Sequence, residues 1–91
     1  MAAIEPQTIN RARCDLAQRL RLNETEITEV DVEPADFPDG SLGAPVEDEM
    51  SAQVITPGWR IHFQAGGEIY EYRATERQLR LVNFKGQNCR V

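Results

Sequence analysis

The sequence predicts an α+β domain in which one N-terminal helix packs on a four- to five-stranded antiparallel sheet. Three observations support this fold class. An amphipathic period lies near the N-terminus, short alternating runs follow it, and turn-forming residues separate those runs. The 91 residues make one domain, because a chain of this length has no room for two cores. We expect an ordered core over about residues 6–84 and a polar C-terminal tail over residues 85–91.

The helix is predicted over about residues 7–21. Pro6 suits the first helical position, with Thr8 as an alternative cap, and Asn23 suits a left-handed stop. Cys14 falls off the apolar stripe, on the solvent side. The stripe follows a 3-4-3 spacing and consists of Ile9, Ala12, Arg13, Leu16, Ala17 and Leu20. This side of the helix is predicted to face the sheet.

The clearest strand signal is a hairpin over residues 59–73, because two alternating runs flank Gly66-Gly67 and glycine accepts the positive φ of a two-residue turn. This turn fixes the register: Phe63 faces Tyr70, Ile61 faces Tyr72, and Trp59 faces Ala74. One face is then apolar and packs on the helix, whereas the other is mostly charged. On the charged face His62 lies opposite Glu71, which is expected to raise the pKa of His62.

The remaining elements are shorter. Residues 26–33 alternate as a strand that Pro34 is expected to stop, and residues 78–84 form a last strand. Residues 36–45 are a turn-rich loop that Phe37 and Leu42 anchor to the core. An acidic connector follows over residues 46–50. Residues 51–56 form a strand or an extended segment that Pro57-Gly58 closes.

Charge and composition restrict the function classes. The net charge of −5 and the pI of about 4.8 argue against a nucleic-acid partner. Ten acids and no lysine or arginine lie between Leu22 and Trp59, which indicates either a solvated acidic edge or a surface that docks onto a basic partner. No signal-peptide core and no run of 18 apolar residues occurs, so we expect a cytoplasmic protein without a membrane span.

No constellation of a known chemistry is complete. Cys14 and Cys89 are expected to be free thiols in a reducing compartment, with a bridge between them as the alternative. Without a CxxC motif or a Cys/His cluster, no metal site is predicted, and the acids before Gly40 do not fit the spacing of a calcium loop. A His62–Glu71 pair with Ser41 as nucleophile lacks a third, orienting group. No catalytic residue and no cofactor is therefore predicted.

Three segments stand out in order along the chain: Phe37-Pro-Asp-Gly-Ser-Leu-Gly-Ala-Pro, Ala52-Gln-Val-Ile-Thr-Pro-Gly-Trp-Arg-Ile, and Ile69-Tyr-Glu-Tyr-Arg. Together they resemble a family of small uncharacterised bacterial domains, and the helix end Leu16-Ala-x-Arg-Leu also fits. The resemblance covers about residues 12–82. Ala44 stands where the family pattern has cysteine. The resemblance implies no assigned activity, but it implies that the loop and the hairpin form one unit.

These observations favour a small non-catalytic binding or protein-interaction domain whose partner is another protein, docked at an exposed sheet edge. The alternative is a small-ligand sensor or carrier with a pocket between loop 37–45 and the hairpin, and a third hypothesis is a small hydrolase-like enzyme. Gln53 is also expected to satisfy the loop backbone. The predicted binding residues are Phe37, Asp39, Ser41, Gln53, Trp59 and Arg60.

Overall fold

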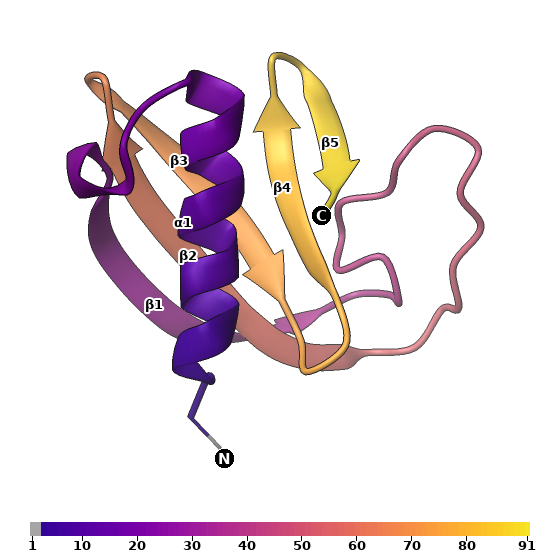
Figure 1. Cartoon of the computed structure of the whole chain (residues 1–91). Helices are drawn as coiled ribbons and strands as arrows, with labels where there is room; N and C mark the ends of the chain where they lie inside the picture. The colour runs from indigo at the N-terminus through magenta and orange to yellow at the C-terminus, as the bar shows by residue number, and fades with distance from the viewer. Residues whose placement is uncertain (1–2) are drawn as a thin grey trace.

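A computed structural model describes residues 3–91 and confirms the predicted fold class (Figure 1). One helix, α1 (Pro6–Leu20), crosses one face of a five-stranded antiparallel sheet whose strand order follows the chain, β1-β2-β3-β4-β5. A 3-10 turn, η1 (Glu24–Glu26), leads from the helix to the sheet. The strands are β1 (Thr28–Phe37), β2 (Thr56–Ala65), β3 (Glu68–Ala74), β4 (Leu79–Phe84) and β5 (Gln87–Arg90).

Helix α1 begins with Pro6 at its first position and buries Ala12, Leu16 and Ala17 against the sheet, as the stripe predicts. It ends at Arg21, which adopts the left-handed conformation with φ of 57°. The predicted stop at Asn23 is wrong by two residues. Asn23 instead begins η1, where its backbone N–H donates to the Glu26 carboxylate at 2.8 Å.

The β2–β3 hairpin has the predicted register, with Phe63 opposite Tyr70, Ile61 opposite Tyr72 and Trp59 opposite Ala74. Gly66 and Gly67 form its turn with φ of 56° and 81°. The apolar face of the hairpin packs under α1, and the rings of Phe63 and Tyr72 meet edge to face at 5.9 Å. The main core therefore lies between α1 and this face.

Three strand boundaries differ from the prediction. Strand β1 continues past Pro34 to Phe37, because β1 is an edge strand and the missing N–H of proline costs no ladder hydrogen bond there. Strand β2 begins at Thr56 and includes Pro57 and Gly58, whereas residues 51–55 form no strand. At the C-terminal end Gln87–Arg90 forms β5 where a polar tail is predicted, with Gly86 at φ of 83° in the turn.

The connection from β1 to β2, residues 38–55, covers part of the sheet face that α1 leaves free. Phe37, Leu42 and Ala44 are buried, yet they do not belong to the core under α1. The guanidinium groups of Arg60 and Arg73 each lie 5.5 Å from the centre of the Phe37 ring. The loop is thus anchored by buried side chains as predicted, but on the charged face of the hairpin rather than in the main core.

Candidate functional site

An aspartate turn organises the first part of the connection. The Oδ1 atom of Asp39 accepts hydrogen bonds from the Ser41 hydroxyl at 2.6 Å, the Ser41 N–H at 2.9 Å and the Gly43 N–H at 3.2 Å. These bonds lower the pKa of Asp39, and the bond from the Ser41 hydroxyl contributes most. Ser41 is fully buried, so these two predicted binding residues serve to shape the loop.

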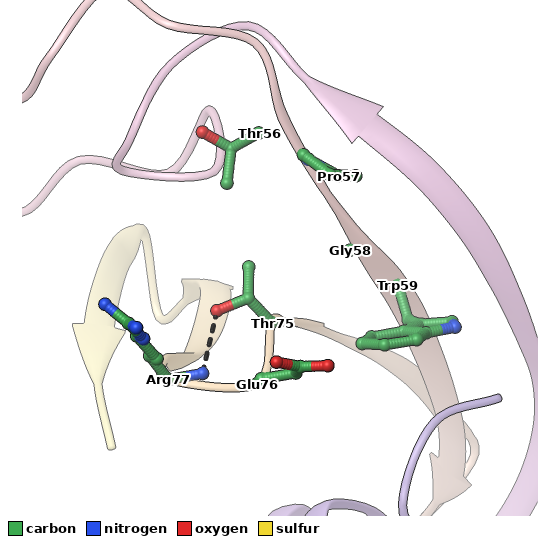
Figure 2. A pocket seen from close by; sticks show the side chains of 7 residues that line it. All are labelled: Thr56, Pro57, Gly58, Trp59, Thr75, Glu76 and Arg77. Atoms are coloured by element: carbon green, nitrogen blue, oxygen red, sulfur yellow. Dashed lines mark hydrogen bonds between the residues drawn. The ribbon is translucent and has the colours of Figure 1, made fainter. Parts of the chain in front are cut away.

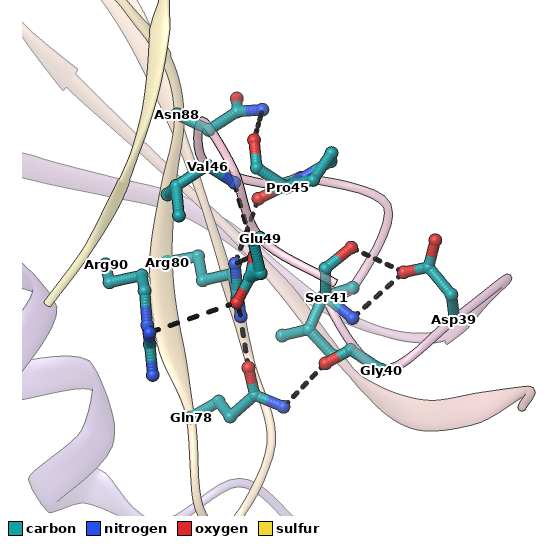
Figure 3. A network of polar contacts seen from close by, with 12 residues as sticks. Asp39, Gly40, Ser41, Pro45, Val46, Glu49, Gln78, Arg80, Asn88 and Arg90 are labelled. Atoms are coloured by element: carbon teal, nitrogen blue, oxygen red, sulfur yellow. Dashed lines mark hydrogen bonds and ion pairs between the residues drawn. The ribbon is translucent and has the colours of Figure 1, made fainter. Parts of the chain in front are cut away.

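Gln78 joins this turn to the sheet (Figure 3). Its amide Nε2 donates to the Gly40 carbonyl at 2.8 Å, and its Oε1 accepts from Arg80 Nε at 3.0 Å. The prediction that Gln53 satisfies the loop backbone is therefore wrong. Gln53 is exposed, and its neighbour Ala52 contributes only a backbone carbonyl, which accepts from Gly40 N–H at 2.9 Å.

The acidic connector is clamped by a bidentate ion pair between Arg80 of β4 and Glu49 (Figure 3). Arg80 donates to the two carboxylate oxygens at 2.5 and 2.6 Å and also to the Ala44 carbonyl at 3.2 Å. The side chains of Arg80 and Glu49 are only 4% and 13% exposed. The hydrogen bonds from Arg80 lower the pKa of Glu49 to about 2. Asn88 Nδ2 of β5 also donates a hydrogen bond to the Pro45 carbonyl at 2.9 Å.

Beyond the clamp, residues 50–55 form what we call the arm. They loop out beside β4 and β5, away from α1 (Figure 1). Three of the six side chains are large, apolar and exposed: Met50 at 97%, Val54 at 58% and Ile55 at 74%. Glu47 and Asp48 precede them and are exposed as well. The structure therefore presents an apolar segment with an acidic border on a fixed support.

A chain of charges crosses the sheet on the face opposite α1. His62 contacts Glu71 through Nε2 at 3.0 Å, which confirms the predicted pair, and Asp31 through Nδ1 at 2.6 Å. Burial by itself would lower the pKa of His62, but the two carboxylates outweigh it and the pKa is raised. Glu71 also accepts a hydrogen bond from Arg73 Nε, and Arg73 Nη1 donates to the Leu42 carbonyl at 2.8 Å.

Asp31 is the orienting group that sequence reasoning misses. A register shift between Glu29 and Asp31 moves Asp31 opposite His62, and alternation alone does not reveal such a bulge. The chain of charges does not include Ser41, because the Ser41 hydroxyl donates its hydrogen bond to Asp39. Both ring nitrogens of His62 contact carboxylates, so the imidazole ties β1, β2 and β3 together.

A hollow of about 360 Å³ lies at the start of β2 (Figure 2). Trp59 is the one predicted binding residue that lines it. The others lie elsewhere, with Arg60 over the Phe37 ring and 3.9 Å from Glu33. The lining residues are Thr56, Pro57, Gly58, Trp59, Thr75, Glu76 and Arg77, so none comes from loop 37–45, where the sequence analysis places a pocket.

Cys14 and Cys89 are free. Among residues 3–91 no group of three or more histidine, cysteine or acidic side chains is arranged to hold a metal ion. Within the same range α1 is too short and too polar to cross a membrane, and no other helix is longer.

A family model with the description Domain of unknown function (DUF8738) matches residues 9–82, a range that begins within α1 and ends within β4. No curated protein and no solved structure matches the chain.

Proposed function

We propose that this chain, which belongs to the family Domain of unknown function (DUF8738), is a non-catalytic protein-interaction domain that docks through its arm onto a basic partner surface. The observation that carries the proposal is the exposure of Met50, Val54 and Ile55 within six consecutive residues. Clustered apolar side chains on a soluble domain mark interaction sites more often than scattered ones do.

The clamp supports the proposal because it fixes the base of the arm. The Arg80–Glu49 pair and the Gly40–Ala52 hydrogen bond hold the chain on both sides of Met50. A segment that is already ordered loses less conformational entropy when a partner covers it. The apolar arm with its acidic border also has the anatomy of a protein interface, an apolar centre inside a polar rim.

The charges specify the chemistry of the partner. Glu47, Asp48 and Asp36 are exposed, and the ion pairs of the described residues leave these three carboxylates unengaged. A partner with lysine or arginine around an apolar patch complements this surface. Such complementarity accelerates encounter and makes binding depend on salt.

The sequence favours docking by strand addition at an exposed sheet edge, but three features of the β1 edge oppose it. Pro34 lacks an N–H, Glu33 and Asp36 are charged and exposed, and the register shifts next to Asp31. These are the devices by which edge strands avoid pairing. At the other edge, β5 has only four residues and its pairing with β4 contains a register shift. We therefore assign the contact to side chains of the arm.

The test is a capture experiment in an extract of the native host with three forms of the domain. The wild type is compared with Met50→Ser/Ile55→Ser and with a matched control, Val30→Ser/Ile69→Ser, which removes two exposed apolar side chains elsewhere. The proposal predicts a protein that the wild type and the control retain, that the arm variant loses, and that elutes at raised salt. Equal retention by all three forms would refute it.

A further inference from the structure

We infer that the surface around Trp59 is a binding site for an organic cation carried on an apolar chain, such as an alkylguanidinium or alkylammonium group. Besides the hollow of about 360 Å³, a second hollow of about 260 Å³ lies against Trp59. The two share Trp59, Thr75 and Glu76, so both hollows border the indole. The second hollow is completed by Ala3, Glu5 and Thr8 at the start of α1.

The second hollow is negative and aromatic. Its six lining residues include two carboxylates, Glu5 and Glu76, and no basic side chain. The N-terminus of α1 contributes about half a positive charge, which two full negative charges outweigh. Figure 2 shows the Glu76 carboxylate directed toward the indole, whereas the Arg77 side chain points away from it. An aromatic face beside carboxylates is the arrangement that attracts guanidinium and ammonium groups.

The first hollow suits the apolar part of such a ligand. The Thr56 hydroxyl donates to the Val54 carbonyl at 3.0 Å, and the Thr75 hydroxyl accepts from the backbone N–H groups of Arg77 and Gln78 at 3.1 Å each. Because both hydroxyls are bonded to the backbone, Pro57 and the Trp59 ring provide most of the apolar contact surface. Arg77 also lines this hollow, but its side chain points away from the indole (Figure 2). The two bonds to the Thr75 hydroxyl fix the turn that carries Glu76.

This site shares no residue with the arm, so the inference can be tested independently of the proposed function. The ligand chemistry has two sources, a free amine or guanidine and the side chain of a lysine or arginine in a protein. Both place a delocalised or compact cation at the end of a flexible apolar chain.

The assay is a fluorescence titration, because Trp59 is the only tryptophan of the chain. The probes are butylguanidinium and its neutral isostere butylurea, at low salt. We expect a saturable change with butylguanidinium and at least about tenfold weaker binding of butylurea. The variant Glu5→Gln/Glu76→Gln is expected to weaken butylguanidinium binding by about tenfold or more. Glu24→Gln, which changes an exposed acid of η1 beyond the C-terminal end of α1, is expected to weaken it by less than about twofold.

Two further measurements complete the design. Calorimetry on Trp59→Leu, checked for folding by circular dichroism, is expected to show the loss of binding. A tripeptide with a central arginine then identifies the source, with a citrulline tripeptide as its neutral control. Tighter binding of the arginine peptide than of butylguanidinium indicates a protein side chain. Weaker binding indicates a free metabolite. Equal binding of butylguanidinium and butylurea, or no saturable binding of butylguanidinium up to about 10 mM, would overturn the inference.

Discussion

Replacement of Arg80 by methionine is expected to remove a large part of the stability of the domain. The variant leaves Glu49 without its bidentate partner and leaves the Ala44 carbonyl without a donor. Arg80 is 4% exposed on its side chain, so water replaces these bonds only if the connection detaches. Removing one member of a buried pair is more costly than replacing both.

The magnitude follows from the pKa of Glu49, which falls from 4.5 to about 2 on folding. A shift of this size corresponds to at most about 3 kcal/mol at neutral pH. Solvent screens part of the interaction because the Glu49 side chain is 13% exposed, and the Val46 N–H and Arg90 also lower this pKa. About 2 kcal/mol is therefore assigned to Arg80. The lost hydrogen bonds to Ala44 and Gln78 raise the total to about 3 kcal/mol, a loss of roughly 12–24 °C in Tm.

The assay is urea and thermal denaturation followed by circular dichroism, with Arg90→Met as the matched control. Arg90 is 69% exposed and lies 4.0 Å from Glu49, so its replacement is expected to change stability by less than about 0.5 kcal/mol. The folded pKa of Glu49 is depressed, so its contribution is present above about 4.5 and is lost as the pH falls toward 2. Glu49→Gln is therefore less stable than wild type at pH 7, and the difference shrinks as the pH falls from about 4.5 toward 2. An Arg80→Met variant as stable as Arg90→Met would refute the reasoning.

Three other substitutions test separate parts of the fold. His62 has a raised pKa, so its stabilising charge is complete below about 6.5 and is lost as the pH rises through the folded value; His62→Gln is expected to flatten the stability profile above pH 6.5 in urea titrations. Gly58→Ala places a methyl group against the Ala74 carbonyl and is expected to cost about 2 kcal/mol or more in chemical denaturation. Tyr72→Phe removes the bond from the Tyr72 hydroxyl to Asp15 at 2.7 Å and is expected to cost about 1 kcal/mol in the same assay.

Each of these three predictions has an outcome that contradicts it. An unchanged slope of stability against pH in His62→Gln would show that the charge chain from Asp31 to Glu71 contributes nothing. Gly58→Ala is compared with Gly66→Ala, where the added methyl meets open space and only the positive φ is unfavourable; equal losses would mean that the close approach to Ala74 is unimportant. A Tyr72→Phe variant as stable as wild type would mean that the bond to Asp15 adds no net stability.

Sequence reasoning recovers the parts of the fold that repeat locally. The spacing of Leu16 and its neighbours fixes the buried side of α1, and Gly66-Gly67 fixes the register of β2 on β3 to the residue. Both signals depend on residues close together in the chain. The cross-strand pair of His62 and Glu71 follows from the same register.

The rest depends on contacts between distant residues. Glu49 and Arg80 are 31 positions apart, and an acid in an acidic connector gives no sign of a buried partner. Phe37 is predicted as an anchor, but the choice between the two faces of the sheet requires the path of the whole connection. Gln78 rather than Gln53 binds the loop for the same reason. Among the predicted binding residues, Trp59 alone lines the hollow, because the lining comes from a turn after β3.

The length of the β1–β2 connection bears on the order in which the strands assemble. Two residues, Gly66 and Gly67, join β2 to β3, whereas 18 residues separate Phe37 from Thr56. Closing the longer loop costs about 2 kcal/mol more in chain entropy. The β2–β3 hairpin is therefore expected to nucleate folding and β1 to join last. The Arg80–Glu49 pair divides the long loop into two shorter ones, so the clamp that stabilises the finished domain also brings β1 within reach of the growing sheet.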